Sequence, residues 1–142
     1  SEYTINDVLR EFGHAINGCD VLVAHNITFD DNVIKCEYSR NNMINYMERY
    51  RGEKYCTMRN SEKVCKIERK WPNGNVTYKW PTLEELHHHF FRNNPTNLHN
   101  SLVDIFVCFR CFYKLKYDED ILREDSGLRA YYNSLCQRRY TA

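Results

Sequence analysis

The sequence predicts an α/β fold, and the order of elements in its first third carries that expectation. A helical pattern of apolar residues covers positions 4–17, and a short β-branched run, DVLVA at 20–24, follows at once. A second helix is expected to open near residue 28. A helix, a strand and a helix in this order are typical of a sheet flanked by helices. With 42% hydrophobic and 14% aromatic residues, the 142-residue chain has enough apolar material for a globular core.

The first helix has clear boundary signals. Thr4 and Asp7 have the spacing of a capping box, and Gly18 is a suitable C-terminal stop. The run at 20–24 predicts a strand that is buried on both faces, as in a parallel sheet. Residues 30–52 predict one helix with a break near Asn41-Asn42, or two helices.

The middle of the chain predicts short strands and a hairpin. Residues 53–58 and 63–68 are expected to be strands, and the PNGN sequence at 72–75 predicts a turn between strands at 67–71 and 76–80. Thr82 and Glu85 form a second capping-box pattern at the start of a helix. The rest of the chain predicts a loop at 93–97, a long helix at 100–117 and a tail at 118–142. The tail is expected to contain a helix near 128–138.

Composition excludes several classes of protein. Twenty basic and nineteen acidic residues give a net charge of +1, so bulk charge does not indicate a nucleic-acid binder. No apolar run reaches the roughly 20 residues of a membrane span, and no leader peptide is evident, so we expect no membrane partner. The seven cysteines are odd in number and irregularly spaced, which favours reduced thiols and an intracellular location. Cys108 and Cys111 resemble half of a metal motif, but buried free thiols are the favoured interpretation.

The first candidate functional stretch lies where the predicted strand gives way to the second helix. His25, Asn26, Phe29 and Asp30 follow directly on that strand. Sites in α/β sheets form at the carboxyl ends of strands, so this position makes Asp30 a candidate functional carboxylate. The alternative is structural, because Asp30 also suits the helix cap or the helix dipole.

The second candidate stretch opens the long helix. His99 precedes it, and Asp104 lies inside it among aromatic and β-branched neighbours. A carboxylate in so apolar a run is costly to bury unless a cation pairs with it. The alternative is an exposed helix face that carries Asp104 together with Cys108 and Cys111.

Taken together, the two stretches resemble the DEDDh 3′→5′ exonucleases, the family of polymerase proofreading subunits and ribonuclease T. The His-Asn-x-x-Phe-Asp sequence at 25–30 resembles the second motif of that family, and His99 with Asp104 resembles the third. Between them, YCTM at 55–58 and WPTLEEL at 80–86 resemble the body of such domains. The resemblance implies a ribonuclease-H-like fold, with a mixed sheet flanked by helices, over residues 1–117.

The resemblance also implies a chemistry and a role for each residue. It implies hydrolysis of phosphodiester bonds at single-stranded nucleic-acid 3′ ends, assisted by two divalent ions, Mg²⁺ or Mn²⁺. Asp30 and Asp104 would bind the metal ions, and His99 would be the general base. His25, Asn26 and Phe29 would shape the substrate side of the junction, with Phe29 expected mainly in the core.

The sequence departs from the family at the first motif, because it contains no Asp-x-Glu. We therefore expect residues 1–142 to be the C-terminal part of an exonuclease domain. The N-terminal strands and the acidic pair would then lie in an upstream segment that acts as a partner. The alternative is a degenerate exonuclease-fold module that binds nucleic acid or protein without cleavage.

Two further features have open interpretations. His87, His88 and His89 are expected to face solvent, because Leu83, Leu86 and Phe90 mark the apolar face of their helix. The hairpin region is basic, and this charge is either a solvated face or a grip on phosphates. Its two tryptophans either pair across the hairpin or stack on bases.

Overall fold

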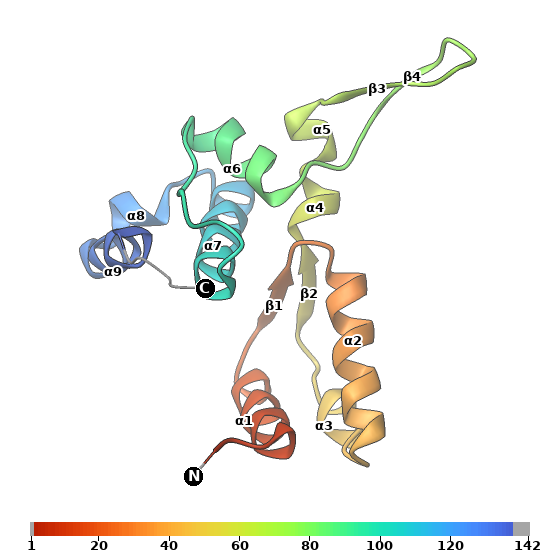
Figure 1. Cartoon of the computed structure of the whole chain (residues 1–142), viewed down its shortest axis with the longest axis vertical. Coiled ribbons are helices and arrows are strands. Elements are labelled where there is room, and N and C mark those ends of the chain that lie inside the picture. The colour runs from red at the N-terminus through yellow and green to blue at the C-terminus, as the bar shows by residue number, and fades with distance from the viewer. Residues whose placement is uncertain (1, 138–142) are drawn as a thin grey trace. The chain divides into compact units, whose positions relative to one another are not determined.

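A computed structural model describes residues 2–137 as a mixed α/β protein. The chain divides into two compact units, Ser1–Cys56 and Thr57–Ala142. Figure 1 shows the elements along the chain, from α1 at the N-terminal end to α9 near the C-terminal end. The boundary follows directly on strand β2, so each candidate stretch belongs to one unit. None of the helices within residues 2–137 is long and apolar enough to cross a membrane.

The first unit is a parallel strand pair with its connecting helices. Its elements in chain order are α1 (Ile5–Asn17), β1 (Val21–Ala24), α2 (Ile27–Arg40), α3 (Asn45–Glu48) and β2 (Glu53–Cys56). The register pairs Val21 with Glu53 and Ala24 with Cys56. Parallel neighbours need a crossover connection, and α2 and α3 provide it here. The strand expected to be buried is only half-buried, because the described residues pair β1 with β2 alone.

A small apolar core holds α1, α2 and α3 together. Its buried members are Leu9, Ile16, Tyr38, Met43 and Met47. The Tyr38 hydroxyl is satisfied in this apolar setting, since it donates a hydrogen bond to the main-chain oxygen of Leu9 at 2.6 Å. Burying a hydroxyl without such a partner would be costly.

The second unit is mainly helical and is built around one long central helix. Its elements are α4 (Thr57–Asn60), α5 (Glu62–Cys65), β3 (Glu68–Lys70), β4 (Val76–Tyr78), α6 (Leu83–Phe91), α7 (Ser101–Tyr117), α8 (Ile121–Glu124) and α9 (Ser126–Gln137). The buried side chains of α7 pack with those of α6, α8 and α9; the core comprises Leu86, Val103, Phe106, Val107, Cys111, Leu122, Tyr132 and Leu135. This core fixes the start of α7, where the second candidate stretch lies.

Most of the expected element boundaries are confirmed. Capping boxes begin α1 and α6: the Thr4 hydroxyl accepts from the Asp7 N–H at 3.2 Å, and Thr82 accepts from Glu85 at 3.1 Å. The break near Asn41-Asn42 separates α2 from α3. In the tail, α9 forms over Ser126–Gln137; residue 138, the last of the helix expected there, lies outside the described residues.

The strand expected at 63–68 is wrong. The N–H groups of Val64 and Cys65 both donate to the main-chain oxygen of Ser61, at 3.1 and 2.9 Å, which makes one helical turn. Lys66 then adopts a left-handed conformation (φ 51°) and ends that turn. Only the residues from Glu68 onward are extended, and they form the hairpin with β4.

No cysteine within residues 2–137 forms a disulfide. Cys108 and Cys111 are buried, at 8% and 0% exposure. Burial raises the pKa of the Cys111 thiol well above its ordinary value, so the neutral form is favoured. The expected burial of this pair is therefore confirmed, and the exposed-face alternative is wrong for both cysteines.

Candidate functional site

The first candidate stretch forms the tight junction between β1 and α2. Asn26 is left-handed, with φ 73° and ψ 60°, a conformation that asparagine tolerates better than most residues. Its main-chain oxygen accepts from the N–H of Phe29 at 3.1 Å and from that of Asp30 at 3.5 Å. The chain therefore turns from strand to helix within two residues, and Asp30 lies in the first turn of α2.

Asp30 is an exposed carboxylate in this first turn. Partial desolvation raises the pKa of its carboxyl above the ordinary value, and its own main-chain N–H and the charge of His25 offset part of that rise. Among the described residues, no Lys, Arg or His side chain lies within ion-pair distance of Asp30. The helix N-cap is Asn26, so the alternative role of Asp30 as the cap is wrong, although the helix dipole still favours a negative charge here.

The neighbouring carboxylate, Asp31, has a different role. It binds Lys35 at 2.8 Å and Lys54 at 2.9 Å, and the second pair ties α2 to β2. Burial alone would raise the pKa of Asp31, but the hydrogen bonds and charges of the two lysines lower it overall. Asp31 is therefore occupied in structural ion pairs, and Asp30 is the carboxylate of this turn that is open to a ligand.

Phe29 does not lie in the core, and the expectation that it does is wrong. Its side chain is 64% exposed. The inward stripe of α2 carries Ile27, Ile34 and Tyr38, at spacings of seven and four residues, and Phe29 falls outside that stripe. The junction thus presents an aromatic ring to solvent one residue before Asp30.

The second candidate stretch is the start of α7. His99 is left-handed, with φ 82°, and its main-chain N–H donates to a carboxylate oxygen of Asp104 at 3.0 Å. The side chain of Asn100 caps the helix by accepting from Leu102 and Val103, at 3.1 and 3.4 Å. These bonds fold the loop back over the first turn, so His99 and Asp104 lie next to each other although five residues separate them.

Asp104 lies at the rim of the apolar face of α7. It is half-buried, its neighbour Val103 is buried in the core, and His99 is exposed. One carboxylate oxygen accepts from His99, and the other has no hydrogen-bond partner among the described residues. This oxygen is a free donor atom for a hard cation such as Mg²⁺ or Mn²⁺.

Each unit therefore supplies one carboxylate together with a nearby histidine from the predicted set. Asp30 and His25 lie in Ser1–Cys56, and Asp104 and His99 lie in Thr57–Ala142. Within residues 2–137, no group of three or more His, Cys, Asp and Glu side chains is arranged to hold a metal ion. Carboxylate oxygens are the kind of ligand that divalent ions prefer, and each unit supplies one such carboxylate from the predicted set.

The expectation that three consecutive histidines face solvent is wrong for His87, which is fully buried. Its Nδ1 lies 2.8 Å from the main-chain oxygen of Asn93 and 2.9 Å from the side-chain oxygen of Asn94, so Nδ1 is the donor. Its Nε2 then accepts from Arg110 at 3.1 Å. Desolvation lowers the pKa of His87, which favours this neutral tautomer. The signal was present in the sequence, because His87 lies four residues after Leu83 on the apolar side of α6.

Arg110 connects this buried histidine to α8. Its guanidinium donates two hydrogen bonds to Asp120, at 2.9 and 2.6 Å, and stacks on the Phe91 ring with 3.6 Å to the centroid. Burial alone would raise the pKa of Asp120, but the hydrogen bonds from Arg110 to its carboxylate lower the pKa overall. The network is fully paired, which indicates a structural role in holding α6, α7 and α8 together.

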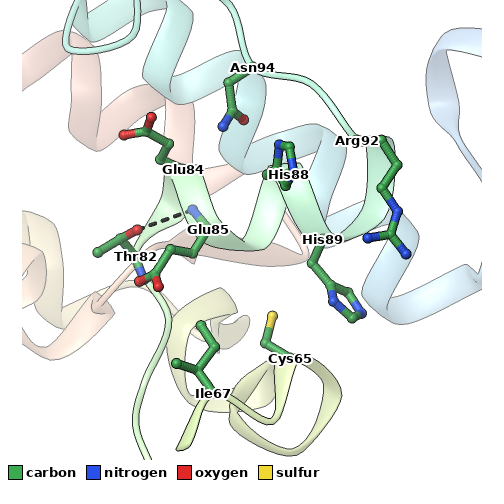
Figure 2. Close-up of a pocket in the computed structure, with 9 residues that line it drawn as sticks. All are labelled: Cys65, Ile67, Thr82, Glu84, Glu85, His88, His89, Arg92 and Asn94. Carbon is green, nitrogen blue, oxygen red and sulfur yellow. Dashed lines mark hydrogen bonds between the residues drawn. The ribbon is translucent and has the colours of Figure 1, made fainter.

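A cavity of about 470 Å³ lies beside α6 (Figure 2). Its lining comprises Cys65, Ile67, Thr82, Glu84, Glu85, His88, His89, Arg92 and Asn94. Figure 2 shows the capping bond between Thr82 and Glu85 at one end, and Glu85 also binds Lys79 at 2.7 Å. Partial burial raises the pKa of Cys65, so its thiol is a poor nucleophile. No candidate catalytic residue from either motif lines this cavity.

The chain matches no protein-family model, no curated protein and no solved structure.

Proposed function

We propose that this protein is a metal-dependent 3′→5′ exonuclease of the DEDDh type, with a ribonuclease-H-like fold. The observation that carries the proposal is the 3.0 Å hydrogen bond from the main chain of His99 to Asp104. It joins a loop histidine to a half-buried carboxylate that keeps one oxygen free. The parallel β1–β2 pair, with a tight turn into α2, gives the second motif the strand-to-helix setting that the resemblance implies.

In this proposal the chain's own residues have distinct tasks. The free oxygen of Asp104 and the exposed carboxylate of Asp30 would each hold a divalent ion, and such ions would supply an activated water and positive charge beside the phosphate. The imidazole of His99 accepts the proton of the attacking water; imidazole is the side chain that changes charge near neutral pH. His25, Asn26 and Phe29 contact the substrate, and the exposed Phe29 ring offers a face to a terminal base.

The proposal also requires carboxylates beyond these two. Within the described residues β1 pairs only with β2, so its other edge has no strand beside it. A strand with the Asp-x-Glu pair at that edge would complete the ligand set. The second candidate function, binding without cleavage, is favoured by the absence of Asp-x-Glu from the 142 residues.

The test compares cleavage with binding in the full-length product of the gene that encodes this chain. A labelled single-stranded oligonucleotide is incubated with Mg²⁺, with Mn²⁺ or with EDTA, and retention on the protein is measured in parallel. We expect metal-dependent shortening that Asp104→Asn abolishes. The matched control is Asp118→Asn, which changes an aspartate whose carboxylate is almost fully exposed at the other end of α7. Binding without shortening at any metal concentration would overturn the nuclease and support the second candidate.

A further inference from the structure

The second unit has a strongly basic segment, residues 59–80, here called the basic arm. It carries six lysines and arginines against two glutamates, a net charge of +4, whereas the whole chain carries +1. The other residues therefore have an acidic balance. A positive charge concentrated in one segment indicates a surface that binds a polyanion.

The centre of the basic arm is a hairpin that contributes nothing to the core. All six residues of β3 and β4 are exposed, so the two-stranded ribbon is exposed on both faces. The turn is fixed locally: Gly74 has φ 87°, its N–H donates to the main-chain oxygen of Trp71 at 3.0 Å, and Asn73 accepts from Asn75. An isolated two-stranded hairpin is marginally stable, and none of its six strand residues belongs to the core of the second unit, so burial in that core does not account for these side chains.

Both tryptophans of the chain lie on the basic arm and are largely exposed. Trp71 is 42% exposed and Trp80 is 50% exposed. Trp71 donates to the Thr77 hydroxyl at 2.8 Å and Trp80 donates to Glu62 at 3.1 Å, so each indole is anchored by its nitrogen. Among the described residues the two rings do not contact each other, which makes the cross-hairpin pair wrong.

Arginine stacks on each anchored ring. The guanidinium of Arg69 lies 4.2 Å from the centroid of Trp71, and that of Arg59 lies 5.5 Å from Trp80. Residues 69 and 71 share one face of the ribbon, because side chains alternate along a strand, and Thr77 pairs with Arg69 on the same face. A cation and an aromatic ring held side by side offer a phosphate contact and a stacking surface together.

Three lysines complete the surface. Lys63, Lys66 and Lys70 are exposed, and no carboxylate within the described residues lies within 4.0 Å of them. By contrast Lys79, at the base of the hairpin, is already paired with Glu85 at 2.7 Å. Unpaired lysines beside exposed aromatic rings are the pattern of single-strand binding, where the charges follow the backbone and the rings stack on unpaired bases.

We propose that the basic arm binds single-stranded nucleic acid, with phosphates at Lys63, Lys66 and Lys70 and a base stacked on Trp71. The inference rests on the proposed function only for the class of ligand, since it uses none of the motif residues. A duplex fits less well, because its bases are already stacked. An acidic peptide would satisfy the lysines and leave the rings unused.

The experiment measures intrinsic tryptophan fluorescence, because Trp71 and Trp80 are the only tryptophans of the 142 residues. Trp80→Phe leaves Trp71 as the single tryptophan of the 142 residues, and this variant, with tryptophan excited selectively over the eleven tyrosines, is titrated with a twelve-nucleotide oligothymidylate in EDTA. We expect strong quenching on binding. A single lysine contact with a phosphate contributes about 0.7 to the salt slope of single-strand binding. The triple variant Lys63→Gln, Lys66→Gln, Lys70→Gln should therefore lower the slope by about 2 and weaken affinity at least tenfold.

The matched control removes three charges elsewhere: Arg10→Gln, Arg40→Gln, Arg51→Gln, all exposed and in the first unit. It should bind like the parent. Equal loss in both triple variants, absence of quenching, or equal binding of a duplex or of polyglutamate would overturn the inference. Measuring metal-dependent shortening of the same oligonucleotide, by the parent and by Asp104→Asn, beside this titration separates the two proposals. Binding that depends on the basic arm without metal-dependent cleavage would contradict only the proposed exonuclease activity. Cleavage without arm-dependent binding would contradict only the proposed role of the basic arm.

Discussion

The main-chain N–H of His99 and the carboxylate of Asp104 are joined by a 3.0 Å hydrogen bond across the first turn of α7. Because the donor is the main-chain N–H of His99, the imidazole of His99 takes no part in this bond. A substitution of the His99 side chain can therefore remove the imidazole and keep the main-chain hydrogen bond to Asp104.

Replacing the imidazole should remove catalysis and keep the fold. His99→Asn is the appropriate variant, since asparagine accepts the left-handed conformation at this position (φ 82°) and keeps the N–H. General-base catalysis contributes typically about 10²–10⁴ in rate, and we expect a loss of that size in the oligonucleotide assay with an unchanged melting temperature. The control is His14→Asn, an exposed histidine of α1. A fully active His99→Asn protein would show that another group takes the proton.

Asp104→Asn should weaken metal binding without disturbing the loop. The amide oxygen of asparagine can still accept from His99, but the negative charge that attracts a divalent ion is gone. Calorimetric titration with Mn²⁺ should show at least a tenfold weaker affinity for this variant, and Asp118→Asn should match the parent. Equal affinity in all three proteins would mean that the ion binds elsewhere.

The buried His87 predicts a pH-dependent stability of the second unit. Desolvation holds its folded pKa below the unfolded value of 6.5, so the folded state binds fewer protons. The stabilisation is therefore complete above pH 6.5 and is lost as the pH falls through the folded pKa. One proton sets an upper limit of about 1.4 kcal/mol per pH unit on the slope.

This slope is measurable with the two tryptophans, which both report on the second unit. Urea unfolding followed by fluorescence at pH 5, 6 and 7 should give a free energy of unfolding that rises with pH. His87→Leu should flatten the rise, whereas His88→Leu, on the exposed side of α6, should leave it intact. An unchanged slope in His87→Leu would assign the effect to another group.

Replacing Leu86 tests the core of the second unit. It is fully buried beside Val103 and Val107, so Leu86→Ala leaves a cavity and should cost about 2–5 kcal/mol of unfolding free energy. Ile105→Ala, at a side chain 67% exposed on α7, should change it by no more than about 0.5 kcal/mol. Denaturant unfolding of both variants checks the contrast, and equal effects would contradict the assigned core.

The sequence predicts features whose partners are close along the chain. Thr4 with Asp7, and Thr82 with Glu85, satisfy each other within three residues, so their capping boxes are legible without a structure. The hairpin turn at 72–75 has the same local character. The resemblance to a family motif names His99 and Asp104, but the bond between them depends on a left-handed backbone that the motif does not specify.

Features that depend on distant partners were missed. The spacing from Leu83 places His87 on the apolar side of α6, but no local pattern marks its hydrogen bond with Arg110, 23 residues away. Phe29 looked like core material, but its exposure is decided by which face of α2 meets α1 and α3. The turn at 62–65 reads as extended from composition, and it is helical because Ser61 accepts two main-chain hydrogen bonds.

The direction of degradation tests the central claim most directly. A single-stranded oligonucleotide with a 5′ label is offered to the full-length product, once with a free 3′ hydroxyl and once with a blocked 3′ end. The account predicts a ladder of labelled products that shorten stepwise from the 3′ end, only with Mg²⁺ or Mn²⁺ and only on the free substrate. Immediate release of the labelled 5′ nucleotide, equal cleavage of the blocked strand, or no metal-dependent shortening would contradict it.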